Sequence, residues 1–416
     1  MAGNRASISL LFFLSLLPLC VPAQQTNVTD TIVTHPYQHR VYDVNKEEDL
    51  IDLGQKIFDK SAPKRVDTGG VRSGKPRLSG LPAAGYTLQT GFAGILIGNI
   101  AFYTSRSEDA KQSSILANLT YSQYKQILLP IQSNIWTKDN KYNISTDWRY
   151  LKFPSYTYGL GGHTNLSDGY TIDYSGLRLH QGILKELYRN IYLGVGFDFD
   201  YFWGIREVDP PANAKTDFQN YGLKEKEVGS GPTANFLIDT RKNSINPQNG
   251  VFFNVVYRPT FTWLGSDNEW QSLIVDARTY FKFPAYSDNV LAFWTYDWFT
   301  VNGTPPYLLL PNTGGDPYSN TGRGYIQSRL RGMNLVYGEA EYRFNIMRNE
   351  LIGGVVFLNA ESVTDKGTNK FTMVWPGYGA GLRFRLNKFS RTNIAIDYGF
   401  GAGGSQGFFV NLGEVF

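Results

Sequence analysis

Hydrophobic and polar residues alternate one by one along much of this chain. In NIYLGVGFDFDYFW (190–203) every second residue from the second position on is apolar, and the residues between them include Asp198 and Asp200. In NLVYGEAEYRF, Glu339 and Glu341 alternate with apolar residues in the same way. A period of two is the signature of a β-strand, because successive side chains point to opposite faces. The pattern therefore predicts an all-β protein built of two-faced strands.

Sixteen segments fit this pattern, and the connections between them differ in length. Long polar connections at 203–230, 302–333 and 361–376 contrast with short ones such as 345–350 and 387–390. If the first strand runs outward, the long connections gather at the outer end and the short turns at the other, as in outer-membrane barrels. The predicted strands are 85–93, 95–104, 113–122, 125–135, 141–150, 167–180, 189–202, 231–238, 250–262, 270–281, 289–301, 334–344, 351–360, 377–386, 391–399 and 407–416.

Two architectures fit such strands. In a soluble β-sandwich the charged faces look outward to water, whereas in a membrane barrel they line a wet lumen. Alternation alone does not separate the two, and a load of 27 Tyr, 27 Phe, 8 Trp and 43 Gly fits both. A secretory signal and the aromatic last residue, Phe416, favour the membrane barrel.

The signal is the start of the chain, MAGNRASISLLFFLSLLPLCVPAQQ. A basic residue, a short apolar run and Val21-Pro22-Ala23 predict a signal peptide over 1–23, cleaved before Gln24. The apolar run is too short for a membrane-spanning helix, which needs about 20 residues. Lipoprotein processing at Cys20 is the alternative, and Leu17-Pro18-Leu19 is a poor lead-in for it. Cleavage before Gln24 leaves a mature protein without cysteine or disulfides.

A polar segment, 24–80, precedes the predicted barrel, 81–416, and is expected to be periplasmic or luminal. It is rich in Lys, Asp, Gly and Ser and holds one amphipathic helical candidate, KEEDLIDLGQKIFDK. The apolar residues that share a face of this candidate helix are Leu50, Ile51, Leu53, Ile57 and Phe58.

The sequence offers little other chemistry. The charge of +4, from 40 basic and 36 acidic residues, is too mild to indicate a nucleic-acid partner. His35 and His39 have helical spacing, but Pro36 disfavours a helix there, so no metal site is expected. No phosphate-binding loop with its Lys-Ser/Thr and no Gly-x-Ser-x-Gly elbow occurs. We therefore predict no enzyme activity, no catalytic residue and no cofactor.

Five short motifs carry a family resemblance. Arg323-Gly324-Tyr325 lies in the long connection 302–333, and the other motifs are LPAAGYTLQTG (81–91), DTRKNSINPQNG (239–250), GGVVFLNAESV (353–363) and NLGEVF (411–416). In this order and spacing they resemble the BamA-like outer-membrane assembly family (bacterial surface antigens), which includes two-partner secretion transporters. The resemblance implies a sixteen-stranded antiparallel transmembrane β-barrel in the outer membrane of a Gram-negative bacterium. It also implies that the sixth outer loop folds back into the lumen with the Arg-Gly-aromatic motif at its tip.

The chain departs from that family at two places. BamA-like proteins precede the barrel with POTRA domains, and 24–80 is too short for such a module, which predicts a short form lacking them. The family's Phe-x-Asp, whose carboxylate pairs with the loop arginine, reads Phe357-Leu358-Asn359 here. Asn359 carries no charge, so the candidate luminal partners of Arg323 become Glu361, Glu339 and Glu341. The alternative is that Arg323 is solvated in a basic surface loop.

The last strand resembles the C-terminal assembly signal of the family. Its residues are Phe408, Val410, Leu412, Gly413 and Phe416. Glycines weaken strand pairing, so Gly407 and Gly413 favour a labile seam between the first and last strands.

Two functions follow from the resemblance. The first is insertion, assembly or translocation of outer-membrane or secreted client proteins, with a separate periplasmic or lipoprotein subunit replacing the POTRA domains. The second is a passive pore or a structural scaffold of an outer-membrane complex. A soluble secreted β-protein is the third alternative. The state of the seam separates the first two, because an insertase needs a poorly paired terminal strand and a pore needs a closed one.

Overall fold

The computed structural model of the protein describes residues 46–58, 76–87, 91–107, 109–212 and 215–416. These residues belong to one structural unit, Tyr42–Phe416. The predicted signal peptide, Cys20 and the pair His35 and His39 lie outside the described residues.

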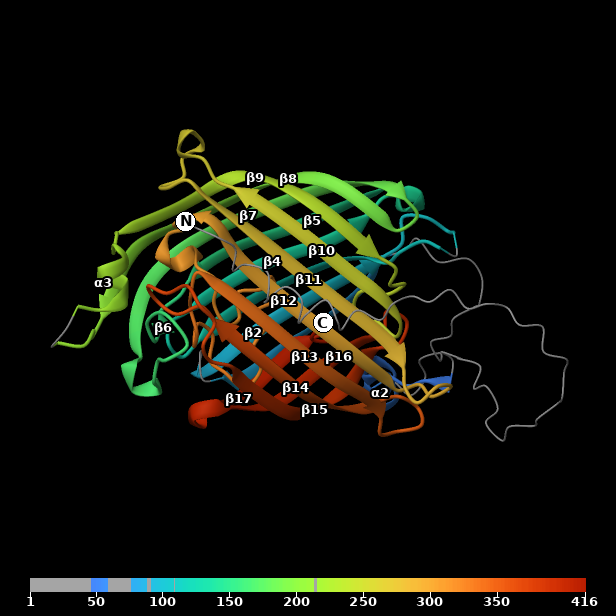
Figure 1. The fold of residues 1–416 in the computed structure, drawn as a ribbon. Coiled ribbons are helices and arrows are strands. Elements are labelled where there is room, and N and C mark those ends of the chain that lie inside the picture. Colours follow the sequence, from blue (N-terminus) through green and yellow to red (C-terminus); the bar gives the residue numbers. More distant parts are fainter. Residues whose placement is uncertain (1–45, 59–75, 88–90, 108, 213–214) are drawn as a thin grey trace, which may run out of the picture. The chain divides into compact units, whose positions relative to one another are not determined.

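Strands dominate the described chain and form one seventeen-stranded sheet (Figure 1). In chain order they are β1 (Arg77–Thr87), β2 (Gly91–Phe102), β3 (Ser113–Ser122), β4 (Ile127–Trp136), β5 (Tyr142–Lys152), β6 (Ser155–Thr157), β7 (Tyr170–Tyr188), β8 (Ile191–Val208), β9 (Lys226–Asp239), β10 (Gly250–Pro259), β11 (Trp270–Lys282), β12 (Val290–Gly303), β13 (Asn334–Asn345), β14 (Ile352–Val363), β15 (Trp375–Asn387), β16 (Thr392–Gly401) and β17 (Gln406–Leu412). Helices form at α2 (Leu50–Phe58) and α3 (Asp217–Tyr221), and 3₁₀ turns at η2 (Lys138–Asn140), η3 (Leu166–Asp168), η4 (Thr262–Leu264), η5 (Tyr307–Leu309) and η6 (Ala402–Gly404). None of the helices in the described ranges is long and apolar enough to cross a bilayer.

Antiparallel ladders connect the strands in chain order from β1 to β17, with one local exception at β6. Both β5 and β6 pair with the same long neighbour, β7. Pro154, which lies between β5 and β6, has no N–H to donate to the ladder, and proline interrupts strand pairing for this reason. The predicted count of sixteen therefore differs from the sheet by β6, a three-residue continuation of β5.

The first predicted strand, 85–93, is wrong. This range crosses the turn between β1, which ends at Thr87, and β2, which begins at Gly91. The true first strand begins at Arg77, so the predicted barrel boundary at residue 81 falls inside it. Its sequence, RLSGLPAAGYT, contains two glycines and a proline and lacks the alternation that marks the later strands.

The last predicted strand, 407–416, is too long. β17 ends at Leu412, and Gly413 then adopts a positive φ of 101°. Such a left-handed backbone is accessible to glycine without steric penalty, so the chain turns there. Phe416 therefore lies outside the strand that the alternating pattern assigned to it.

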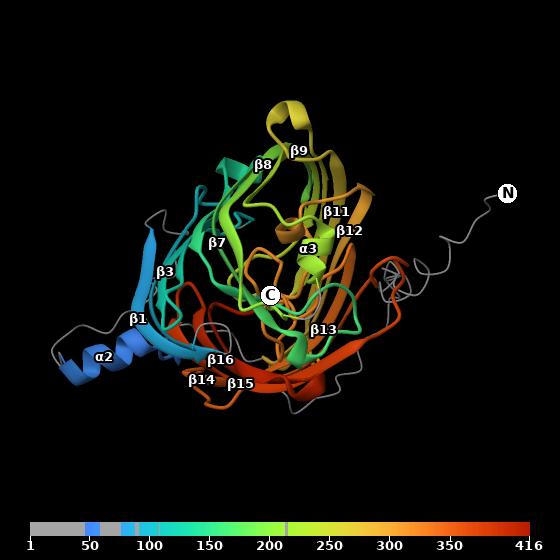
Figure 2. The same ribbon diagram turned by 90° about the vertical axis from the view of Figure 1, so that its left-hand side faces the viewer.

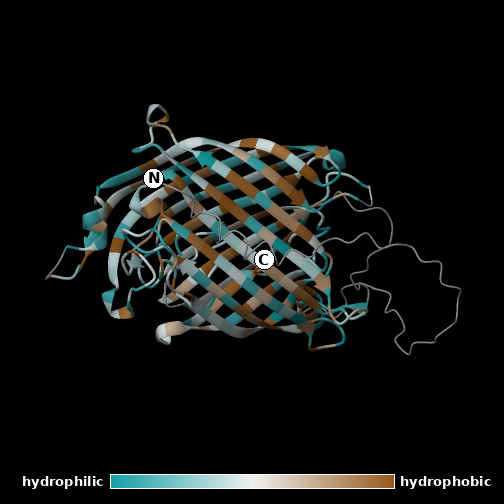
Figure 3. Ribbon diagram, in the orientation of Figure 1, coloured by the Kyte–Doolittle hydropathy of each residue, from teal (hydrophilic) through white to brown (hydrophobic). Residues whose placement is uncertain are grey.

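The faces of the sheet are those of a membrane barrel and the reverse of those of a soluble sandwich. Along β13, Glu339 and Glu341 are buried inside, whereas Ala340 and Tyr342, which alternate with them, are partly exposed. Large apolar side chains are exposed at alternate positions around the sheet, and Figure 3 shows the resulting bands along the strands. Exposed members include Phe92, Leu96, Leu119, Ile183, Val195, Val356, Leu358, Tyr378 and Phe408.

The connections divide by length between the two ends of the strands. One end carries the long connections 153–169, 209–225, 304–333 and 364–374. The other end carries short turns, such as 189–190, 346–351 and 388–391. Figure 2 looks along the strands from the long-loop end and shows the curved wall with chain segments inside it.

Candidate functional site

The loop 304–333 lies against the inner face of the wall and crosses the lumen. On one side the carbonyl oxygen of Pro317 accepts hydrogen bonds from Gln132 of β4 and Arg149 of β5. On the other side Arg323 contacts acidic residues of β13 and β16. The loop is therefore docked at both sides of the lumen, and Arg323 is completely buried.

Arg323 is the centre of a buried ion cluster. Its Nη1 donates to Oδ2 of Asp397 at 2.6 Å, and its Nη2 donates to both Glu339 and Glu341. The guanidinium carbon lies 3.7 Å from the centre of the Phe357 ring, a cation–π contact. Burial alone lowers the pKa of the Arg323 guanidinium, but the surrounding carboxylates outweigh it, and the pKa lies well above its ordinary value. Arg323 is therefore a permanent cation held by three carboxylates.

The sequence-predicted partners divide into two groups. Glu339 and Glu341 contact Arg323, whereas Glu361 accepts a hydrogen bond from Thr313 Oγ1 at 3.0 Å instead. Asn359 contacts the arginine backbone, since its Nδ2 donates to the Arg323 carbonyl oxygen at 2.9 Å. Its side chain therefore holds the loop without supplying charge.

Asp397 also pairs with Arg323, although it was not among the partners predicted from the sequence. Asp397 lies on β16, two strands beyond Asn359 on β14, and is completely buried. Its alternation with the apolar Ile396 and Tyr398 indicates an inward side chain, and this was the available signal. Choosing it among the inward carboxylates required the three-dimensional path of the loop.

The ion cluster extends from Arg323 toward the end of the chain. Arg383 of β15 donates Nη1 to Asp397 Oδ1 at 2.5 Å and Nε to Glu414 Oε2 at 2.7 Å. Arg343 of β13 pairs through Nε with Glu341 Oε1, also at 2.5 Å. Asp397 therefore links Arg323 of the loop to Arg383. Arg383 in turn links Asp397 to Glu414, which follows β17. Shared ions of this kind make neighbouring contacts depend on one another.

Glycines in the wall make room for the loop tip. A Cβ at Gly399 of β16 would lie 2.7 Å from the backbone nitrogen of Gly324 and 3.1 Å from the carbonyl carbon of Arg323. A Cβ at Gly401 would lie 2.5 Å from the Tyr325 ring. Gly324 itself has a φ of 109°, which a residue with a Cβ rarely adopts. The backbone of the tip thus rests directly on the wall.

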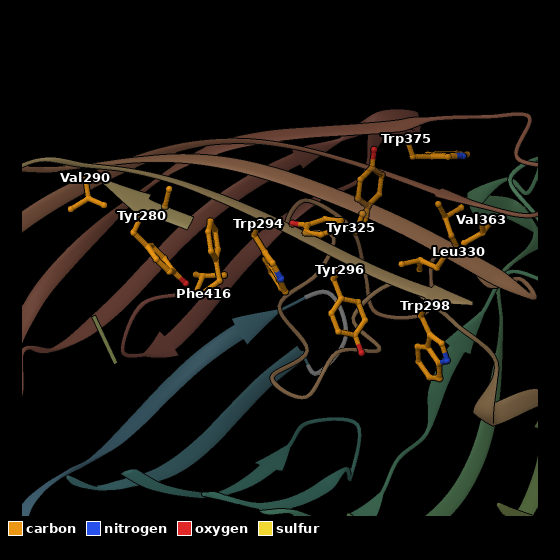
Figure 4. Close-up of a cluster of buried hydrophobic side chains, with 14 residues drawn as sticks. Tyr280, Val290, Trp294, Tyr296, Trp298, Tyr325, Leu330, Val363, Trp375 and Phe416 are labelled. Atoms are coloured by element: carbon orange, nitrogen blue, oxygen red, sulfur yellow. The ribbon is translucent and has the colours of Figure 1, made fainter. Parts of the chain in front are cut away.

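Tyr325 packs beside this contact. Its hydroxyl donates to the Pro376 carbonyl oxygen and accepts from the Ala402 backbone nitrogen at 2.8 Å. Its ring meets Trp375 edge-on, with 6.0 Å between the ring centres, and Figure 4 shows the two side chains together. The three predicted motif residues, Arg323, Gly324 and Tyr325, therefore all contact the inner wall.

The model of the Omp85 superfamily domain matches residues 111–416. The chain belongs to the Omp85 superfamily. No curated protein matches its sequence. The protein is thus an outer-membrane β-barrel of a Gram-negative bacterium, in a superfamily of transport and assembly proteins.

Two solved structures show the same fold as this Omp85 barrel. BamA from Haemophilus ducreyi lacking POTRA domains 1–3 is 13% identical, with a TM-score of 0.50, and the match covers 82% of this chain and 70% of that one. CdiB from Escherichia coli is 10% identical, with a TM-score of 0.51, and the match covers 80% of this chain and 61% of that one. At such identity the similarity concerns the fold. The chain spans about three fifths of the length of CdiB.

The end of the Omp85 barrel turns inward after β17. Phe408 is exposed on the outer face, and Val410 and Leu412 are partly exposed. After Gly413, the ring of Phe416 packs on Trp294, with ring centres 5.1 Å apart (Figure 4). The predicted assembly-signal residues are therefore split between the outer wall and the lumen, and their role as a signal stays a prediction.

The start of β1, at the seam with β17, is hydrogen-bonded to the end of β15 and to the β15–β16 turn. The two strands of the seam lie close together. Among the described residues, however, no ladder of backbone hydrogen bonds pairs β1 with β17. Arg77 at the start of β1 donates Nη1 to the Phe389 carbonyl oxygen at 2.7 Å. Asn387 donates Nδ2 to Ser79 Oγ at 3.1 Å. At the short-turn end, these contacts therefore connect β1 directly to β15 and its following turn, beyond the end of β17.

Replacing Arg77 with alanine is expected to loosen the seam. The variant loses one charge-assisted hydrogen bond, worth about 1.5 kcal/mol for a partly exposed arginine. The unheated protein should run as a compact band on a semi-native gel and convert to a slower band at a lower temperature than the unmodified protein. Lys282→Ala, which removes an exposed pair with Asp288 in another short turn, is the matched control. Equal conversion temperatures for Arg77→Ala and the unmodified protein would contradict the bridging role.

Within the described ranges no group of three or more His, Cys, Asp or Glu side chains is placed to hold a metal ion. The carboxylates of the cluster are instead occupied by arginines.

Proposed function

We propose that this Omp85 barrel acts in the insertion, assembly or translocation of outer-membrane or secreted client proteins. A separate periplasmic or lipoprotein subunit delivers the clients. The seam carries this proposal, because β1 and β17 meet without a backbone ladder in the part of the chain that the structure describes. We assign the short-turn end to the periplasm, the arrangement typical of outer-membrane barrels.

The seam suits strand templating. Unpaired backbone N–H and C=O groups at a sheet edge recruit another extended strand by hydrogen bonding. β17 is seven residues long, whereas its neighbour β16 has ten, so the edge of β16 extends beyond it. A client strand that pairs with β1 needs no nucleotide, since the backbone hydrogen bonds themselves supply the free energy.

The docked loop supports the strands beside the seam. Arg323 connects β13 with β16, and Asp397 connects the same arginine to Arg383 of β15. These strands therefore stay together when the seam opens, and opening is confined to β1 and β17.

A passive pore or scaffold is the second candidate, and the side-chain bridge at the seam favours it. Arg77 and Asn387 hold β1 to the β15–β16 turn even without a backbone ladder. If that bridge never opens, the barrel offers no edge to a client, and the luminal loop acts as a plug.

A reversible lock of the seam separates the two functions. Arg77→Cys combined with Phe389→Cys places two thiols where the native side chains touch, and a short, reducible bifunctional maleimide joins them. Cys20 is the only native cysteine of the sequence. Membrane vesicles from the producing cells retain any partner subunit, and the measurement is assembly of a labelled outer-membrane protein into them. The lock is expected to abolish assembly, and reduction of the linker should restore it.

The same linker across a hairpin away from the seam provides the control. Asn134→Cys with Asn143→Cys joins β4 to β5, whose side chains already contact each other. This cross-link should leave assembly unchanged. Full assembly through a locked seam would overturn the proposal and favour the pore or scaffold.

A further inference from the structure

The helix α2 is fastened to the wall by its acidic start. Asp49 caps the helix, since its Oδ1 accepts from the Asp52 backbone nitrogen at 2.7 Å. Its Oδ2 accepts from the backbone nitrogen of Lys388 at 2.8 Å. The Nζ of Lys388, a completely buried side chain, pairs with Asp52 Oδ2 at 2.7 Å. A buried ion pair and a hydrogen bond from the Lys388 backbone therefore hold the start of α2 at the β15–β16 turn.

A second turn at the same end also binds this segment. The backbone nitrogen of Glu48 donates to the Asn349 carbonyl oxygen at 3.0 Å, and Asn349 Nδ2 donates to Glu48 Oε2 at 2.9 Å. Asn349 lies in the β13–β14 turn. The helix is thus positioned by two periplasmic turns.

The apolar face of α2 points away from these contacts. Asp52 faces the turn, and residues five positions apart on a helix differ by about 140° in direction. Ile57 is 61% exposed, Phe58 is 90% exposed and Leu53 is 39% exposed. An exposed apolar face on a helix that is held in place indicates a surface that meets something apolar.

The position of this face relates it to the lipid-facing surface of the barrel. In Figure 1 α2 lies at the short-turn end, and in Figure 2 it extends outside the curved wall beside β1. Near the same end, Leu78 at the start of β1 is 71% exposed on the outer face. Ile346 and Met347, in the turn that binds Glu48, are 54% and 41% exposed. The apolar surface of the barrel therefore continues onto α2.

We propose that α2 lies in the periplasmic interface of the outer membrane, with Leu53, Ile57 and Phe58 in the phospholipid. An amphipathic helix in such an interface buries its apolar face roughly 5–10 Å into the boundary between headgroups and acyl chains. The partner of this face is a phospholipid surface, because the face projects from the outside of a membrane barrel and continues its lipid-facing surface. A helix of nine residues is short for independent membrane binding. The Asp52–Lys388 ion pair attaches α2 to the barrel and so keeps it at the membrane.

This placement gives the β15–β16 turn a further role. Through Lys388 the turn holds α2, and through Phe389 and Asn387 it holds the start of β1. The helix thereby attaches the periplasmic end of the seam to the membrane. The inference stands whether or not the seam opens, so its test is independent of client assembly.

Fluorescence quenching with paired probe positions tests the lipid contact. Ile57→Cys and Gln55→Cys, labelled with a thiol-reactive fluorophore, differ by about 200° around the helix. The labelled full chain is reconstituted into phosphatidylethanolamine and phosphatidylglycerol vesicles. A nitroxide on the lipid acyl chain should quench the probe at residue 57 several-fold more than the probe at residue 55. Iodide in the water should quench the two probes in the opposite order.

Each other outcome overturns the proposal. If iodide quenches both probes equally and the lipid nitroxide quenches neither, the face is exposed to water. If neither quencher reaches the probe at residue 57, the face is covered by protein, either a second copy or a partner subunit. Heat-modifiable migration of both variants shows that the barrel is folded, so a loss of lipid quenching is not attributable to misfolding.

Discussion

Arg323→Ala is expected to release the loop 304–333 from the inner wall while the barrel still folds. The variant leaves Glu339, Glu341 and Asp397 buried without the cation that contacts all three. Removing one partner of a buried ion pair costs about 3–5 kcal/mol. Because the loop crosses the lumen, its release should increase single-channel conductance in a planar bilayer, expose the loop to added protease and impair client assembly.

Two further substitutions serve as a conservative replacement and as a control for Arg323→Ala. Arg323→Lys should restore only part of the docking, since an ammonium lacks the planar fork that reaches several carboxylates. Arg206→Ala removes an arginine that pairs with Asp173 and has a side chain 72% exposed, so it should leave conductance unchanged. If Arg323→Ala resembles Arg206→Ala in conductance and protease resistance, the ion cluster does not hold the loop.

Gly399→Ala is expected to displace the same loop without changing any charge. The added methyl group would lie 2.7 Å from the backbone nitrogen of Gly324 and 2.9 Å from its Cα. These are backbone atoms, so the clash is relieved only by moving the tip or the strand, and overpacking of this kind typically costs about 1–3 kcal/mol. Conductance should rise as in Arg323→Ala, and protease should cut within 304–333.

Gly338→Ala is the matched control for this strand glycine. A Cβ at Gly338 of β13 meets no atom within 4 Å, so the variant should behave as the unmodified protein. A normal conductance in Gly399→Ala, with the loop still resistant to protease, would mean that the tip does not rest on β16. Agreement between Gly399→Ala and Arg323→Ala would show that docking depends on shape as well as on charge.

The all-β architecture and the loop that enters the lumen could both be predicted from the amino-acid sequence. Alternation is a local property with a period of two, so it identified the strands from β3 to β16, apart from the short β6, and put Glu339 and Glu341 on the inner face. It failed at β1, where small residues and Pro82 hide the period, and at β17, where Gly413 ends the strand. The order of short motifs indicated the family, and the position of Arg323-Gly324-Tyr325 indicated which loop enters the lumen.

The contacts between residues far apart in the sequence could not be predicted in this way, because they depend on the three-dimensional path of the chain. Arg323 and Asp397 are 74 residues apart, and their pairing depends on the curvature that brings β13 and β16 to the same loop tip. Distant backbone segments also approach each other at two other places. Gly399 lies against the loop tip, and Arg77 is hydrogen-bonded to the β15–β16 turn. The amphipathic pattern of α2 was visible in the sequence, but the outward direction of its apolar face depends on the pair between Asp52 and Lys388. Local periodicity indicates which face of a strand a residue occupies. Contacts across the lumen or the seam depend instead on how the whole sheet curves.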